Sequence, residues 1–207
     1  MMAATDRLHG GLVHPRRVRV LASHASRVVP GDAHVLDVGT GDGRIAAALG
    51  AARPDLRIEG IDVLVRPDAG IPVAAFDGRT IPFPSRSVDV VTLFDVLHHA
   101  DDPALLLSEA ARVARWCVVL KDHVANGPIS RAILRFMDDV GNRRYGVALP
   151  HRYLSTGEWA AAIDRLGLAR SLWTVGGLDL YPWPASVVFG ARLHVLARLD
   201  VGTRVSE

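Results

Sequence analysis

Short, nearly continuous apolar runs alternate with stretches of helical periodicity along the chain of 207 residues. Residues 88–94 and 116–120 are two such runs, typical of parallel strands buried on both faces. Between them, residues 103–115 carry apolar side chains at helical spacing. This alternation predicts an α/β fold. Strands are expected from residue 34 and at 57–61, 71–76, 88–94, 116–120, 168–175 and 187–199, with helices at 14–29, 44–52, 103–115 and 129–142 and another started by Ser155 or Thr156.

A glycine-rich turn lies between the first predicted strand and the helix that follows it, in the segment His34–Leu49. Glycines let a ligand approach the backbone closely, and the free N–H groups at a helix start can bind its polar atoms. The spacing is G-x-G-x-G, and Arg44 replaces the third glycine of a dinucleotide fingerprint. We therefore expect a nucleotide-type cofactor, contacted by Asp37, Gly39, Thr40, Gly41 and Gly43.

Acidic residues end two further predicted strands. Asp62, followed by Val63, stands where a carboxylate can accept hydrogen bonds from both ribose hydroxyls of an adenosine cofactor. Asp95 follows the fourth strand and emerges at the edge where ligands bind in parallel sheets. A solvated loop acid is the alternative interpretation of Asp62.

These features occur in a characteristic order. The glycine turn, Asp62, the segment Phe76–Gly78 and the segment Val96–His99 together resemble the class I S-adenosylmethionine-dependent methyltransferases, in particular their type 11-like domain. The resemblance covers residues 30–125 well and the rest weakly. It implies S-adenosylmethionine as the cofactor, with Asp77 accepting a hydrogen bond from the adenine amino group and Gly78 beside it.

The resemblance also implies the architecture. We expect a Rossmann-like, doubly wound sheet of seven strands, mostly parallel, with an antiparallel last strand inserted beside the fifth. Residues 1–207 would form a single methyltransferase domain, in which 1–30 provide a helical cover and 126–166 a helical insertion on the acceptor side. The chain departs from the family pattern after Asp62, because the segment before the third strand is too short for a regular helix and holds two turn signals.

Histidines provide the candidate acid–base groups, because an imidazole titrates near neutral pH. His99 and His123 are the candidate catalytic residues, with Asp122 beside His123 as a second acid–base pair. Packing beneath the cofactor is the structural alternative for the histidines, and capping of a loop is that for Asp122. We expect no metal site, because neighbouring residues such as His98 and His99 point to different sides and no acid–histidine spacing completes a ligand set.

Three further groups have two interpretations each. Arg16 and Arg17, in the leading helix, could meet a carboxylate or form a solvated basic face. The segment Arg143–Tyr145 could recognise an acidic or planar acceptor, or be an ordinary exposed loop. Tyr181 and Trp183 could line the acceptor pocket or close the core.

Composition narrows the classes of partner. The net charge is +2 and no block of basic residues occurs, so we expect no nucleic-acid partner. The single cysteine, Cys117, lies in an apolar run and is expected to be a buried core thiol, and it excludes an internal disulfide. No apolar run reaches spanning length and the amino terminus lacks a signal-type core, so we expect a cytoplasmic protein without stable membrane insertion.

The resulting functional hypothesis is an S-adenosylmethionine-dependent methyltransferase that acts on a small-molecule acceptor by in-line transfer. A non-catalytic cofactor-binding module is the alternative from another class, because no residue in the resemblance is obligatory for chemistry. An NAD-dependent oxidoreductase is disfavoured by the glycine spacing. The acceptor, the need for a general base and the oligomeric state do not follow from the sequence.

Overall fold

A single seven-stranded sheet forms the centre of the computed structural model, which describes residues 13–142, 149–190 and 192–202. The strand order is β3-β2-β1-β4-β5-β7-β6, and only β7 runs antiparallel to its neighbours. This confirms the predicted doubly wound sheet and the insertion of the last strand beside the fifth. The strands are β1 (His34–Val38), β2 (Arg57–Asp62), β3 (Val73–Ala75), β4 (Val88–Phe94), β5 (Ala114–His123), β6 (Ala169–Val175) and β7 (His194–Asp200).

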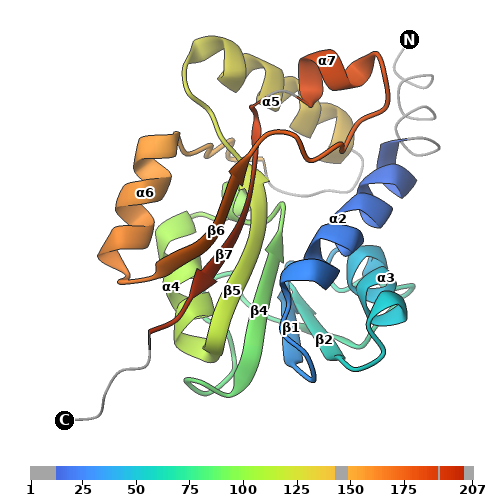
Figure 1. Ribbon diagram of the computed structural model, residues 1–207, viewed down its shortest axis with the longest axis vertical. Coiled ribbons are helices and arrows are strands. Elements are labelled where there is room, and N and C mark those ends of the chain that lie inside the picture. Colours follow the sequence, from blue (N-terminus) through green and yellow to red (C-terminus); the bar gives the residue numbers. More distant parts are fainter. Residues whose placement is uncertain (1–12, 143–148, 191, 203–207) are drawn as a thin grey trace.

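Helices cover both faces of the sheet and its upper edge (Figure 1). On one face, α2 and α3 pack against Val35 and Val90, whereas on the other α4 and α6 pack against Leu36 and Val91. Neighbouring residues of one strand thus enter opposite cores, as strand geometry requires. The helices are α2 (His14–Val28), α3 (Arg44–Ala52), α4 (Pro103–Val113), α5 (Pro128–Asn142), α6 (Thr156–Arg165) and α7 (Ala185–Phe189), with the 3₁₀ turn η2 (Leu97–His99).

The predicted helix starts are confirmed. The Asp102 side chain accepts hydrogen bonds from the N–H groups of Ala104 and Leu105. Ser155 and Glu158 form a complete capping box at the start of α6. Cys117 is fully buried, and burial raises the pKa of its thiol to about 11, which confirms the core assignment.

Two predicted elements are wrong in part. Residues 187–189, the predicted start of the last strand, belong instead to α7, because Pro184 precedes a local turn that the Gly190 N–H closes on Ser186. In α5, Ile129 is 76% exposed and Leu134 is fully buried. The short third strand also begins later than expected, at Val73.

The segment between β2 and β3 contains no helix, as its length predicted. The apolar side chains of Val63, Leu64 and Val65 are exposed there. Among the described residues, no helix is both long and apolar enough to cross a membrane.

The close approach of β2 to the glycine turn gives a stability test. A Cβ atom at Gly60 would lie 2.2 Å from Thr40 Oγ1, so Gly60→Ala must displace the turn. We expect a loss of about 1–3 kcal/mol in the free energy of unfolding, measured by urea denaturation. In α3, a Cβ at Gly50 meets only Ile58 Cδ1 at 3.6 Å, so Gly50→Ala should instead raise stability by about 0.5–1 kcal/mol. Equal effects of the two substitutions would contradict this account of the turn.

Candidate functional site

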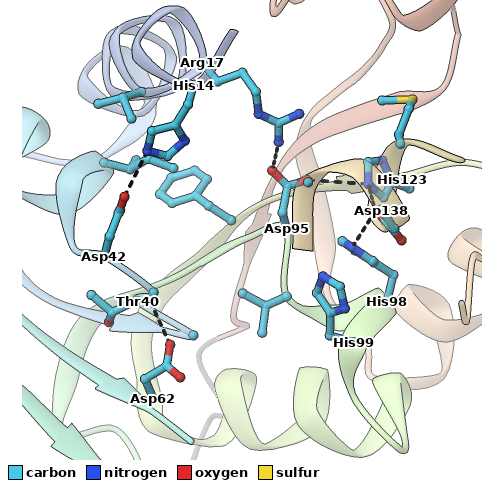
Figure 2. Close-up of a pocket in the computed structure, with 18 of the residues that line it drawn as sticks. His14, Arg17, Thr40, Asp42, Asp62, Asp95, His98, His99, His123 and Asp138 are labelled. Carbon is cyan, nitrogen blue, oxygen red and sulfur yellow. Dashed lines mark hydrogen bonds and ion pairs between the residues drawn. The ribbon is translucent and has the colours of Figure 1, made fainter. Parts of the chain in front are cut away.

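One pocket of about 720 Å³ opens at the carboxyl ends of the parallel strands, within the range typical of ligand sites. Figure 2 shows its two halves: the glycine turn with Asp62 on one side, and a group of histidines and aspartates on the other. Asp95 lies between the two halves. The helices α2, α5 and α7 contribute the remaining walls.

The glycine turn leaves open space where a ligand can approach. Gly39, Gly41 and Gly43 have φ angles of +71°, +61° and +71°, a region that disfavours other residues. A Cβ at Gly39 would clash with Val96 Cγ2 at 2.5 Å, whereas one at Gly41 would meet nothing within 4 Å. Gly39 is therefore needed for packing, and Gly41 faces the open pocket.

Asp62 connects the end of β2 to this turn. Its Oδ2 accepts a hydrogen bond from the Gly41 N–H (2.7 Å), and its Oδ1 accepts one from the Leu64 N–H (2.8 Å). The carboxylate is nearly buried, yet it lines the pocket together with Val63 and Thr40. Each oxygen keeps a lone pair for a ligand hydroxyl.

Three of the predicted cofactor contacts do not line the pocket. Asp37 is buried behind the turn, where Thr92 Oγ1 donates to it (2.6 Å), and burial raises its pKa to about 7. Gly43 packs against Gly70, because a Cβ at Gly43 would lie 2.8 Å from the Gly70 nitrogen. Asp77 is exposed and accepts the N–H groups of Thr80 and Arg79, which lower its pKa. Gly78, by contrast, does line the pocket.

Asp95 is held by two cations at the centre of the site. Arg17 of α2 and the fully buried Lys121 of β5 both form ion pairs with its carboxylate. Burial alone would raise the pKa of Asp95, but Lys121 and Arg17 outweigh it and hold that pKa well below the usual range. Arg17 also donates to the Tyr181 hydroxyl. Of the two interpretations of Arg17, the carboxylate partner is therefore the one observed, and the carboxylate belongs to the chain itself.

The other half of the pocket contains a buried histidine–aspartate cluster. His98 Nδ1 lies 2.7 Å from Asp122 Oδ1, and the Asp138 Oδ1 atom lies 3.6 Å from His98 Nε2 and 3.5 Å from His123 Nε2. Burial opposes a charged imidazole, but the Asp122 and Asp138 carboxylates outweigh it and raise the pKa of His98 to about 10. Burial and the charge of His98 lower the pKa of His123.

The sequence prediction identified this cluster only in part. His99 and His123 do line the pocket, but Asp122 pairs with the His98 ring and accepts only the backbone N–H of His123. The sequence prediction missed Asp138. This residue follows the buried Leu134 by four positions, so helical periodicity places an acid on the inward face of α5. Tyr181 lines the pocket, whereas Trp183 is 82% exposed. The segment Arg143–Tyr145 lies outside the described residues.

Part of the chain is similar to known proteins. Residues 36–116 match the family model described as a methyltransferase domain. This segment, which is less than half of the chain, is similar to the methyltransferase family. A protein from Mycobacterium sp. (strain JLS), named as an uncharacterized methyltransferase, is 35% identical over 118 residues, which are 53% of this chain and 46% of that protein. The chain thus spans about half the length of the curated relatives it matches.

Solved methyltransferases share the fold of this domain. A SAM-dependent methyltransferase from Thermotoga maritima aligns with a TM-score of 0.67 at 16% identity, covering 98% of this chain and 100% of that one. An S-adenosylmethionine-dependent methyltransferase from Mesorhizobium loti aligns with a TM-score of 0.62 at 17% identity, covering 87% and 97%. At these identities the likeness concerns the fold.

The buried carboxyl of Asp37 makes stability depend on pH. Its pKa is about 7 in the folded state against 3.8 for the free side chain. The buried carboxyl therefore leaves the folded state unaffected below pH 3.8 and destabilises it progressively as the pH rises to 7. Asp37→Asn removes the charge and keeps an oxygen to accept from Thr92. Relative to the unsubstituted chain, we expect the variant to be more stable at pH 8 than at pH 4 by about 1–3 kcal/mol, measured by urea denaturation. The exposed Asp68→Asn serves as a control, and equal behaviour of both variants would contradict the assignment.

Proposed function

We propose that this domain is an S-adenosylmethionine-dependent methyltransferase that transfers a methyl group to a small-molecule acceptor by in-line displacement. The observation that carries the proposal is the pocket that joins the glycine turn to buried polar groups at the strand ends. When bound, S-adenosylmethionine supplies a methyl group on a sulfonium, which already is a good leaving group. The protein then has to position the two reactants.

The donor half of the pocket fits this cofactor. Gly41 offers open space beside the backbone, and Asp62 offers carboxylate lone pairs suited to ribose hydroxyls. Asp37 and Gly43 would act indirectly, by shaping the turn from behind. Adenine recognition by Asp77 remains a prediction, because its exposed carboxylate does not line the pocket. The proposed direct contacts are Gly39, Thr40, Gly41, Asp62, Val63, Gly78 and Asp95.

The acceptor half has an apolar wall beside the histidine–aspartate cluster. Phe136 and Met137 of α5 line it together with Tyr181 and Phe189, and the Phe136 and Phe189 rings stack with centroids 6.2 Å apart. A concave site of this kind suits a small molecule with an apolar part better than a macromolecule. His99 and His123 are the polar groups through which an acceptor proton could leave. The cytoplasmic location stays a prediction.

Calorimetric titration with S-adenosylmethionine, its demethylated product and NAD tests the donor assignment. We expect saturable binding of the first two and none of NAD. Asp62→Asn should weaken binding by about 10- to 100-fold, because its amide turns one acceptor into a donor that faces the Gly41 or Leu64 N–H. Asp68→Asn, exposed and outside the pocket lining, should bind as the unsubstituted chain does.

Three outcomes would contradict the proposal in different ways. Binding of NAD alone would indicate an oxidoreductase, and equal affinities of the Asp62 and Asp68 variants would remove the ribose assignment. Binding of the sulfonium without demethylated product from any of a panel of alcohols, amines, thiols and carboxylic acids would favour a non-catalytic module.

His99→Ala tests the base hypothesis once an acceptor is found. His99 lines the pocket at the end of η2, so its loss should lower kcat by about 10²- to 10⁴-fold while leaving cofactor affinity unchanged. Steady-state kinetics across pH 6–9 and calorimetry on the same preparation separate the two effects. A kcat and pH profile unchanged by the substitution would assign His99 to packing.

A further inference from the structure

The proposed methyl transfer gives a role to His123 but none to His98 and Asp138, the other buried members of the histidine–aspartate cluster. His98, His123 and Asp138 are buried, yet all three line the pocket and their polar ends converge (Figure 2). They come from η2, β5 and α5, so three separate elements bring them together. Burying such groups is costly unless a partner satisfies them.

The separations within this cluster fit a shared cation better than direct hydrogen bonds. Asp138 Oδ1 lies 3.6 Å from His98 Nε2 and 3.5 Å from His123 Nε2, and Asp95 Oδ1 lies 3.9 Å from His123 Nε2. Strong charge-assisted hydrogen bonds are shorter, at about 2.7–2.9 Å. Two ligands on one tetrahedral ion, with bonds of about 2.0–2.1 Å, lie roughly 3.4 Å apart.

A second observation is the set of outer hydrogen bonds. Histidines that bind metals usually donate their other ring N–H to a carboxylate or a carbonyl. His98 Nδ1 lies 2.7 Å from Asp122 Oδ1, whose other oxygen accepts the Leu97 N–H. The second oxygen of Asp138 accepts the Tyr153 hydroxyl. Both residues are thus oriented with one atom left for the centre of the cluster.

Hydrogen bonding also determines which nitrogen of His123 is available. His194 Nε2 lies 2.8 Å from the Phe189 carbonyl, which only accepts, so that nitrogen carries the proton. The Nδ1 of neutral His194 then accepts from His123 Nδ1, 3.2 Å away. A neutral His123 consequently directs an Nε2 lone pair toward the carboxylates of Asp138 and Asp95. The Asp138 carboxylate also faces His98 Nε2, and a metal ion would take the place of the proton on that nitrogen.

We propose that His98, His123 and Asp138 bind a divalent transition-metal ion through His98 Nε2, His123 Nε2 and Asp138 Oδ1, with Asp95 beside it. Two imidazoles and one carboxylate form a set that suits Zn²⁺ or Fe²⁺ and disfavours Mg²⁺. The site replaces the expectation of no metal, which considered only neighbours in sequence. Binding of the metal ion to this site does not depend on the proposed methyl transfer.

The charges around the site tolerate a cation. The carboxylates of Asp95, Asp122 and Asp138 face two fixed positive charges, Arg17 and Lys121. With His98 protonated, as its raised pKa implies, these charges sum to zero, and a divalent ion that replaces the His98 proton leaves a net charge of +1. Within the part of the chain that the structure describes, two overlapping groups each bring three possible ligand atoms within 4.8 Å of one another: Asp95 with His98 and His123, and His98 with His99 and Asp138. The proposed set shares two residues with each group.

Metal binding by the full chain tests the proposal. After treatment with a chelator, the protein is titrated with Zn²⁺ and Mg²⁺ by calorimetry, and Co²⁺ is used as a spectroscopic probe. We expect one Zn²⁺ per chain, at least 100-fold weaker binding of Mg²⁺, and visible Co²⁺ bands that indicate nitrogen and oxygen ligands. His98→Gln and Asp138→Asn should each weaken Zn²⁺ binding by at least 100-fold.

His34→Gln provides the matched control. His34, on β1, pairs through its Nε2 with Glu59 of β2 (2.6 Å). It is thus a half-buried histidine with a carboxylate partner, and it lies outside the pocket. The affinity of the His34→Gln variant for Zn²⁺ should equal that of the unsubstituted chain. Loss of binding in His34→Gln equal to that in His98→Gln would overturn the proposal. So would the absence of Co²⁺ bands in the unsubstituted chain, a result that holds even if the cluster variants fail to fold.

Discussion

The ion pairs of Asp95 with Arg17 and Lys121 connect the parts of the molecule on which the pocket depends. The carboxylate lies at the end of β4 with a φ angle of +60°, Lys121 belongs to the neighbouring β5, and Arg17 reaches in from α2. Removing such charges from water costs several kcal/mol for each ion, and the cost is offset only while all partners are present. The leading helix is therefore fastened to the sheet by charge as well as by apolar packing. Asp95 also lies between the glycine-turn half of the pocket and the histidine–aspartate half.

The fold was predictable from the sequence where the signal is local. Val88–Phe94 is buried throughout, and the alternation of such runs with amphipathic helices leaves few topologies. The glycine turn, the caps at Asp102 and Ser155 and the short segment before β3 were likewise evident, because each depends on a few neighbouring residues. Residues 187–189 were misassigned because a valine-rich run favours a strand, whereas the flanking Pro184 and Gly190 decide otherwise.

The glycine-turn half of the pocket could be predicted and most of the histidine–aspartate half could not. Gly41 and Asp62 lie in one strand–turn–helix–strand segment, so a motif describes both. His123 and His194 are 71 positions apart, and Asp122 meets His98 across 24. Such contacts depend on the register of β5 with β4 and β7 and on where α5 crosses the strand ends. A sequence read in order shows each residue but not the neighbours that change its chemistry.

The position of β7 affects how the chain can fold during synthesis. β6 pairs only with β7, and β7 lies between β6 and β5 although it follows both in sequence. On a ribosome, β1 to β5 can form a parallel core early, because domains begin to fold as their residues emerge. The backbone groups of β6 then remain without a strand partner until residue 200 has been synthesised. His194, at the start of β7, arrives at the same moment, so the final strand completes the sheet and the histidine cluster in one step.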